Sequence, residues 1–365
     1  MARVSCPFCN AAFDAPATGP AACPRCGEAL PGRGGASPTT HTTSAEPSRG
    51  PNWSVRVGAL VLVVGVTGGL VALRSFRDSP TPAPPPTADT PVVPPAQLAG
   101  LKYLPSESNV VFAVQPAAIF RHVTKVAGNP AEEMAKAGVP ASALAALGQG
   151  GVPLDAIDHV AGGAVIPDAG DLRLGVALVL RQPLHDEARF LDALKAHRPA
   201  AGNPPHYKVE FGVVPLKLVK LSDTTWLFGW TERDLAPEGN GLSGAMREQL
   251  ARTVPPDAAA CLLTDSADWA AKPPVSLLLT LAGKADWQPG LAKVRAAAAG
   301  LTLTDPPTLR VMTKGATPAA RDELRDAFKR QSGTTGETGE WVYLDAPAER
   351  TGGLAALRAV LAPPK

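Results

Sequence analysis

Beyond residue 26 this sequence has a single cysteine, Cys261, and that residue lies in an apolar run. The large C-terminal part of the chain therefore has no disulfide framework and must be held together by its own hydrophobic core. Length does not prevent this, because 365 residues leave room for two or three domains that each bury a core.

The sequence also lacks any block of lysine and arginine residues. Its formal net charge is +2, and charged residues make up 19% of the chain. Such a balance provides no electrostatic footprint for DNA or RNA, so no nucleic-acid partner is expected. Proline and glycine are abundant, with 39 and 35 residues, but they concentrate at 16–51 and 79–97. They therefore indicate linkers between folded parts.

Four of the five cysteines are gathered near the N-terminus. They form two C-x-x-C pairs, Cys6 with Cys9 and Cys23 with Cys26. Four thiolates in two such pairs supply the closed tetrahedral ligand set of a structural Zn²⁺ site. Two disulfides or a redox-active C-x-x-C are the alternatives, but a redox motif is expected as one pair beside a βαβ unit. The prediction is a zinc ribbon over residues 1–30 that binds one structural Zn²⁺.

The residues around these cysteines resemble small bacterial zinc ribbons. They read Cys-Pro-Phe-Cys at 6–9, then Phe13, then Cys-Pro-Arg-Cys-Gly at 23–27. Members of that family carry a CPxC, an aromatic residue four positions on, a short hairpin and a closing CPxCG. The resemblance implies a structural or partner-binding module, and hence a protein partner for the head. A segment this short has almost no core, so metal binding is expected to supply its folding energy.

An uncharged apolar run covers residues 57–73. With Trp53 as an interface aromatic, the segment 53–74 has about 20 residues and reaches roughly 30 Å as a helix, one hydrocarbon thickness. A buried core helix is the alternative, but Pro-rich linkers at 31–52 and 75–98 leave no neighbouring element to bury it. A cleaved signal peptide fits badly because the run starts far from the N-terminus. The sequence therefore predicts one transmembrane helix over 53–74, followed by a semi-rigid stalk.

The charges around this predicted span do not orient it. Two arginines lie on each side of the uncharged run at 57–73, Arg49 and Arg56 before it and Arg74 and Arg77 after it. Zinc-bound thiolates need a reducing compartment, so we expect a bacterial inner-membrane protein with a cytoplasmic N-terminus and an extracytoplasmic C-terminal domain. Gly65 and Gly69 form a G-x-x-x-G that could pair two spans in a homodimer, although such matches are often accidental in a glycine-rich span.

From residue 99 the sequence becomes globular and repeats itself. Residues 104–114 can be laid over 254–264, because each is a Pro-acidic turn that leads into a short apolar strand. Two further pairs follow: a strand and helix at 175–180 and 187–197 against 309–313 and 318–331, then strands at 225–230 and 340–344 followed by helices at about 242–252 and 352–361. We interpret the domain as two related units, 99–252 and 253–365.

The first unit has an additional predicted hairpin, with strands at 207–211 and 215–221. Antiparallel sheets packed with helices, an α+β fold, explain this order better than a doubly wound parallel sheet. Because the second unit lacks the hairpin, we expect it to have a smaller sheet with an exposed edge and to share an interface with the first unit.

The linear arrangement of this part also supports a resemblance. It runs from Tyr-Leu-Pro at 103–105 through Ala-Ile-Asp-His-Val at 156–160 to a strand and a helix ending in Leu-Asp-Ala-Leu-Lys at 191–195. This arrangement resembles the external domain of uncharacterised bacterial single-pass membrane proteins with an N-terminal zinc ribbon. The resemblance implies an external α+β domain but carries over no established activity to any residue.

Residues with catalytic chemistry are scattered in the sequence. None of the six histidines pairs with another histidine or a carboxylate at a metal-ligand spacing on one helix. Residues 239–244 match G-x-G-x-x-G, but no strand directly precedes them, so a flexible loop into a helix explains the glycines. Four tryptophans could form a carbohydrate platform but are expected to fill sheet–helix layers: Trp226, Trp230, Trp269 and Trp287. No catalytic or cofactor-binding residue is predicted.

These observations favour a non-enzymatic, membrane-anchored protein. It would couple a cytoplasmic zinc-ribbon module to an extracytoplasmic binding or sensing domain, with a protein partner on either side of the membrane. An envelope hydrolase, with the external domain as its catalytic part, and a purely structural tether are the alternatives.

Overall fold

The computed structural model describes residues 2–5, 12–15, 21–22, 29–30, 91–126, 151–168, 172–196, 206–211, 214–235, 241–273, 275–276, 280 and 285–348. The chain divides into two compact units, Met1–Pro51 and Asn52–Lys365. No helix within the described ranges is long and apolar enough to cross a membrane. The segment 53–74, where the sequence predicts the span, lies outside those ranges, as do the linker at 31–52 and the helix expected at 352–361.

The N-terminal unit contains two short antiparallel strand pairs. Strand β1 (Ala2–Ser5) pairs with β2 (Ala12–Ala15), and β3 (Ala21–Ala22) pairs with β4 (Ala29–Leu30). The four cysteines lie outside the described residues of this unit.

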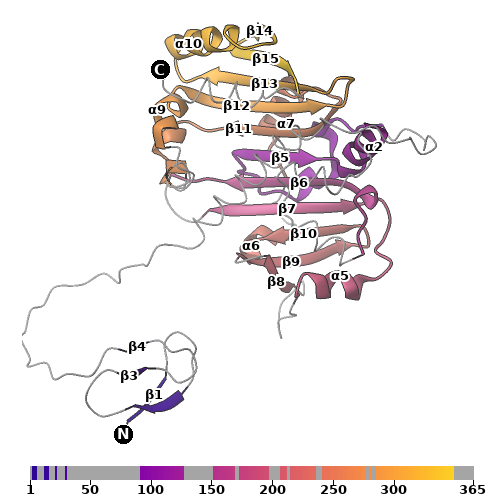
Figure 1. Cartoon of the computed structure of the whole chain (residues 1–365), viewed down its shortest axis with the longest axis vertical. Helices are drawn as coiled ribbons and strands as arrows, with labels where there is room; N and C mark the ends of the chain where they lie inside the picture. Colours follow the sequence, from indigo (N-terminus) through magenta and orange to yellow (C-terminus); the bar gives the residue numbers. More distant parts are fainter. Residues whose placement is uncertain are drawn as a thin grey trace, which may run out of the picture. The chain divides into compact units, whose positions relative to one another are not determined.

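The large unit is built on one antiparallel sheet of 11 strands, with the order β14-β15-β13-β12-β11-β5-β6-β7-β10-β9-β8 (Figure 1). This confirms the predicted α+β class, an antiparallel sheet packed with helices, and the predicted hairpin of β8 and β9 is present. The strands are β5 (Val110–Val114), β6 (Ile157–Val165), β7 (Arg173–Leu180), β8 (Tyr207–Phe211), β9 (Val214–Ser222), β10 (Thr225–Gly229), β11 (Ala258–Asp265), β12 (Val294–Thr302), β13 (Thr308–Gly315), β14 (Thr334–Thr338) and β15 (Trp341–Pro347).

Helical segments cover both faces of this sheet. They are η1 (Pro95–Gln97), η2 (Ala99–Tyr103), α2 (Pro116–Val126), η3 (Leu154–Ala156), α5 (Glu187–Ala193), α6 (Glu232–Leu235), α7 (Gly244–Thr253), η4 (Trp269–Ala271), η5 (Ala285–Trp287), α9 (Gln288–Leu291) and α10 (Pro318–Lys329). Helix α10 illustrates why they form. The Thr317 hydroxyl caps it by accepting from the Ala320 N–H, Pro318 occupies its first turn, and Phe328 is fully buried.

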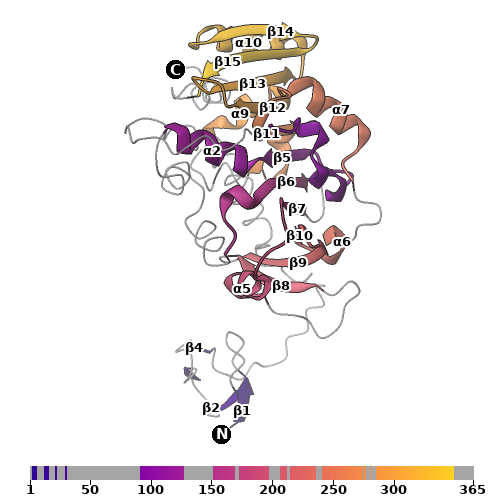
Figure 2. The ribbon, with the colours of Figure 1, turned by 90° about the vertical axis from the view of Figure 1, so that its right-hand side faces the viewer.

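Two faces of the sheet can be distinguished by the helices that cover them. On the α7 face, η1, η2 and α7 pack over Val111, Ala161 and Leu263, among others. On the α10 face, Leu324 and Phe328 of α10 pack over neighbouring strands of the second half, and α2 and α5 lie over strands of the first half. Figure 2 shows α2 and α7 on opposite sides of the sheet. The sheet is therefore buried on both faces, and the segments named on the α7 face all precede β11 in the sequence.

The two halves of the sheet have the same strand order. β5-β6-β7-β10-β9 in the first half corresponds to β11-β12-β13-β15-β14 in the second. The registers also correspond, because Val111 lies opposite Gly163 and Cys261 lies opposite Gly300. Val111 and Cys261 are related by the same offset that relates residues 104–114 to 254–264 in the sequence. Leu104 lies over Gly163, and Val254 lies over Gly300. A Cβ on Gly163 would lie 3.1 Å from the Leu104 Cβ, and a Cβ on Gly300 would lie 3.1 Å from the Val254 Cγ1.

The halves join through β5 and β11, which pair antiparallel with Phe112 opposite Leu262. Phe112 and Leu262 occupy equivalent positions in the two repeats. An approximate two-fold axis therefore passes between them and relates one half of the sheet to the other. The shared interface expected from the sequence is thus a strand pairing, and it merges the two sets of strands into one continuous sheet. β8 has no counterpart among the described strands of the second half, which ends at β14.

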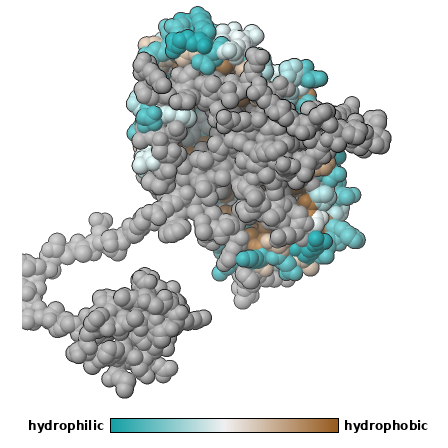
Figure 3. Space-filling view, viewed as in Figure 1, coloured by the Kyte–Doolittle hydropathy of each residue, from teal (hydrophilic) through white to brown (hydrophobic). Residues whose placement is uncertain are grey.

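The exposed edge expected in the second half is strand β14. It is short, and its residues Thr334, Glu337 and Thr338 are exposed. Glu337 forms ion pairs with Arg321 and Arg325 of α10. The surface over α10 and β14 is largely hydrophilic (Figure 3). Short length and charge are features that discourage pairing of an open edge with other chains.

Candidate functional site

The first candidate site is the set of four N-terminal cysteines. The two hairpins of the head place them at matching positions in the sequence. Cys6 directly follows Ser5, which pairs with Ala12, and Cys23 directly follows Ala22, which pairs with Ala29. In each case the second cysteine lies three positions before the returning strand. Elsewhere, the described residues contain no group of three or more His, Cys, Asp or Glu side chains that could hold a metal ion.

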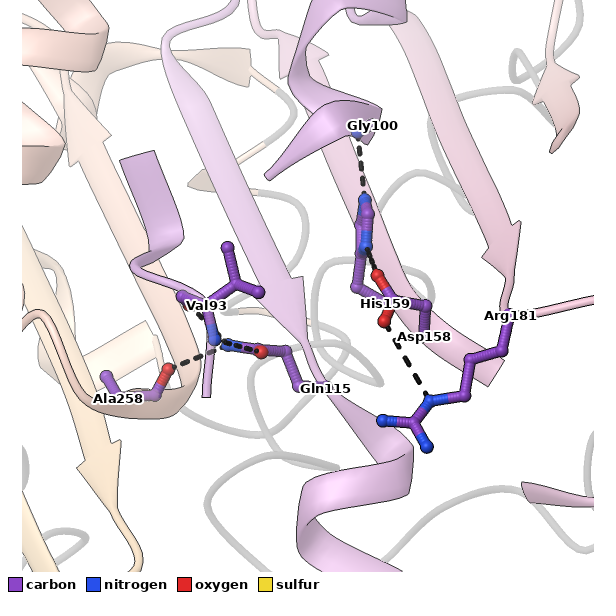
Figure 4. Close-up of polar contacts among 7 residues, drawn as sticks. All are labelled: Val93, Gly100, Gln115, Asp158, His159, Arg181 and Ala258. Atoms are coloured by element: carbon purple, nitrogen blue, oxygen red, sulfur yellow. Dashed lines mark hydrogen bonds and ion pairs between the residues drawn. The ribbon is translucent and has the colours of Figure 1, made fainter. Parts of the chain in front are cut away.

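The second candidate is a pair of buried polar side chains in the large unit, Gln115 and His159 (Figure 4). Gln115 directly follows β5. Its side-chain Nε2 donates to the Val93 carbonyl at 2.8 Å and to the Ala258 carbonyl at 3.2 Å, and its Oε1 accepts from the Val93 N–H at 2.9 Å. The amide therefore completes a strand-like pairing with Val93 and contacts the start of β11. Residues 91–98, which the sequence assigns to a linker, are part of the fold.

His159 lies on β6 beside an irregularity in the β6–β7 pairing, and only 1% of its surface is exposed. Its Nε2 accepts a hydrogen bond from the Gly100 N–H at 2.9 Å. Nδ1 must then carry the proton, and it donates to the Asp158 carboxylate at 2.7 Å. This hydrogen bond lowers the pKa of Asp158 below its ordinary value, and the positive charge of Arg181 acts in the same direction while burial opposes it.

This geometry determines what His159 can do chemically. An Asp–His pair resembles the base and orienting group of a hydrolase, but a general base needs a free lone pair on its outer nitrogen. In His159 that lone pair is occupied by the Gly100 N–H. The pair therefore positions the backbone of η2. His159 follows Asp158 directly before an apolar run, a position typical of an exposed turn, but the residue is buried within β6.

A third polar cluster surrounds Asp234 in α6, whose side chain is 0% exposed. Arg173 of β7 donates to its Oδ1 at 3.0 Å, and the Thr231 N–H and hydroxyl donate to its Oδ2 at 2.9 Å each. Thr231 and Asp234 stand three residues apart at a helix start, which is a capping-box arrangement. That spacing was a usable sequence signal, and it was not recognised. Arg310 and Asp345 form a more exposed, bidentate pair in the second half.

The remaining sequence candidates have structural roles. Cys261 is buried, and burial raises the pKa of its thiol to about 12, which makes it unreactive. Ser243, within the G-x-G-x-x-G match, caps α7 by accepting from the Met246 N–H. Trp226 is fully buried and packs edge-on against Phe190 of α5, so it cannot contribute to an exposed carbohydrate platform. Trp269 donates from its indole to the Arg295 carbonyl.

Comparisons with known proteins add little to this geometry. No family model matches the chain, and no curated protein matches it. One solved structure, described as crystal form III of TP0453, aligns with 72% of this chain and 99% of its own length, at a TM-score of 0.38 and 9% sequence identity. A likeness at that level assigns neither a fold family nor a function.

Proposed function

We propose that the head is a zinc ribbon that binds one structural Zn²⁺ through Cys6, Cys9, Cys23 and Cys26. The observation that carries this proposal is the matched placement of the two C-x-x-C pairs relative to the strand pairs β1–β2 and β3–β4. A ribbon needs each pair between two antiparallel strands so that both knuckles face one ion. The head would then be a stable module that engages a cytoplasmic protein.

We further propose that residues 53–74 anchor the chain in a bacterial inner membrane, with residues 98–365 outside the cytoplasm. The uncharged run at 57–73 and the reducing compartment that zinc thiolates require support this arrangement. A single span would make the protein a connection between two compartments.

For the large unit we propose binding or sensing rather than catalysis. Among the described residues, the buried side chains that most resemble catalytic groups have structural roles. His159 holds η2, Asp234 holds Arg173 and the start of α6, and Cys261 lies within the sheet as an unreactive thiol. Because helices cover both faces of the sheet, a partner would contact the helices and loops outside it. Co-purification from detergent-solubilised membranes tests this proposal, with the wild-type chain and a Cys23→Ser variant as baits. The variant should lose only the cytoplasmic partners.

The proposed topology predicts an all-or-none result in reporter fusions. A reporter that is active only outside the cytoplasm should be active when fused after residue 97, and a cytoplasmic reporter at the same site should be inactive. Fusions before residue 50 should give the opposite pattern. Activity of the cytoplasmic reporter after residue 97 would contradict the topology.

A further inference from the structure

The segment that leads into the large domain, residues 91–104, is held to the sheet at two separate points. At the first point, Gln115 pairs with both backbone groups of Val93. The same side chain also bonds to Ala258, so this point lies where the two halves of the sheet meet. Gln115 is 5% exposed, and bonds shielded from water in this way are not readily exchanged for bonds to solvent.

At the second point, the Gly100 N–H donates to Nε2 of His159 (Figure 4). Gly100 is in close contact with the sheet, since a Cβ at this position would lie 3.0 Å from both His159 Nε2 and the Ala161 Cβ. Leu98 and Leu101 on either side are buried in the cluster under α7. The backbone of η2 is therefore held by one hydrogen bond to a titratable side chain, by a second from the Leu242 N–H to the Leu101 carbonyl, and by apolar packing around them.

We propose that residues 91–104 form a latch between the Pro-rich segment and the sheet, and that acid opens this latch at His159. The hydrogen bond to Gly100 requires an unprotonated Nε2. Protonation of the imidazole places an N–H on Nε2, so that two donors face one another at the distance of a hydrogen bond. The buried Gly100 N–H then loses its acceptor and η2 must move to find another, while the Gln115 point contains no titratable group.

Charged groups surround His159 on its own strand and on neighbouring elements. Asp158 accepts from Nδ1 and carries a negative charge, because this hydrogen bond lowers the pKa of its carboxyl group below the ordinary value. Arg181 lies 3.9 Å from the other Asp158 oxygen and partly offsets that charge. Among the residues whose side chains the structure describes, the other charged or titratable ones on elements packed against β6 are Lys102, Tyr103, Arg121, His122, Asp155 and Arg173.

The chemistry of the latch does not depend on the membrane. Its consequence does rest on the proposed function, because an opened latch would lengthen and loosen the covalent connection between the domain and the anchor. The reporter fusions described above test the anchor, and the exchange measurement below tests the latch. Failure of one is therefore distinguishable from failure of the other.

Amide hydrogen exchange on the full chain in detergent tests the latch between pH 8 and 4.5, with rates corrected for the intrinsic effect of pH. Protection of the Gly100 amide should fall at least tenfold as the pH decreases. The Val93 amide and the peptide 309–329 should keep their protection, since neither depends on His159. Unchanged protection of Gly100 down to pH 4.5 would overturn the proposal, and so would loss of protection over the whole domain at the same pH.

Three variants separate the latch from a general effect of acid. His159→Gln keeps an acceptor near Nε2 but cannot be protonated, so Gly100 should stay protected at every pH. Asp158→Asn removes the charge that favours the imidazolium, so opening should require a lower pH. Gln115→Leu should expose Val93 at every pH and leave the response of Gly100 unchanged. If His159→Gln does not fold, the direction of the Asp158→Asn shift decides, and an unshifted midpoint counts against the proposal.

Discussion

Replacement of Cys23 by serine is expected to abolish zinc binding by this protein. The purified wild-type chain should carry one equivalent of zinc, and the Cys23→Ser chain close to none. In a ribbon of this size, which has few residues to form an apolar core, the metal would supply most of the folding free energy, about 10–16 kcal/mol in comparable zinc-finger peptides. Loss of one thiolate from a closed four-ligand site removes both a ligand and the fold that positions the other three.

A matched control is available within the same chain. Cys261 is also a cysteine, but it is buried in β11. Cys261→Ser should therefore retain one equivalent of zinc. Alkylation of freshly isolated cells offers an independent measurement, since all four head cysteines should be recovered without disulfides. Stable disulfides among them would rule out the zinc site and remove the basis for placing the N-terminus in the cytoplasm.

The second large effect is expected from Asp234→Ala, which should destabilise the large domain by about 3–5 kcal/mol. The substitution leaves the Arg173 guanidinium largely buried, with side-chain exposure of 13%, and with the exposed carboxylate of Glu107 in place of its buried partner. It also removes the acceptor of the Thr231 N–H and hydroxyl at the start of α6. Denaturant unfolding followed by tryptophan fluorescence measures this effect, because Trp226 lies in the neighbouring strand β10 and is fully buried.

Asp345→Ala is the corresponding control in the second half of the sheet. Arg310 and Asp345 make two hydrogen bonds of 2.7 Å, but their side chains are 38% and 24% exposed. Water can therefore solvate Arg310 once the carboxylate is gone, and the cost should be only about 1 kcal/mol. Equal losses for the two variants would show that burial does not determine the strength of these pairs.

Much of the second half was recognisable in the sequence because its elements have local signals. Thr317 and Pro318 begin α10 with a cap and a first-turn proline, and the structure has that helix at the predicted position. The turn at 254–257 before β11 was also correctly matched to residues 104–107, and the sheet registers preserve that offset. In both cases the information lies within a few neighbouring residues.

Strand β12 was missed for a physical reason. Its sequence, VRAAAAGLT, is rich in alanine, which favours helices when taken alone. It becomes a strand because β11 and β13 lie on either side of it and pair with it, and its small side chains fit a sheet that is covered on both faces. The tertiary environment overrides the local preference.

The sequence also did not reveal how β10 of the first half aligns with β15 of the second. The sequence comparison aligns the strands at 225–230 and 340–344 from their first residues, which sets Trp226 against Trp341. The strand registers instead give the alignment. In the first half, Gly163, Gly175 and Gly229 lie opposite one another on adjacent strands. The corresponding row in the second half is Gly300, Arg310 and Asp345. Counting back from the last residue of each set places Trp226 against Val342. Both of these side chains are fully buried, whereas Trp341 is half-buried on the other face. A shift of one residue in a strand exchanges its two faces, and identities between residues do not reveal such a shift.

The sequence by itself determined those features of this protein that depend on neighbouring residues: the paired C-x-x-C motifs, the uncharged run at 57–73, the repeated turns and the helix caps. Only the tertiary structure decided that β5 and β11 join the two halves in one sheet, and that Gln115 and His159 hold the segment 91–104. The reason is that the local sequence does not specify which group will form a hydrogen bond with a backbone donor or acceptor at a strand edge or in a buried turn. Their partners are chosen by which groups the whole fold removes from water together.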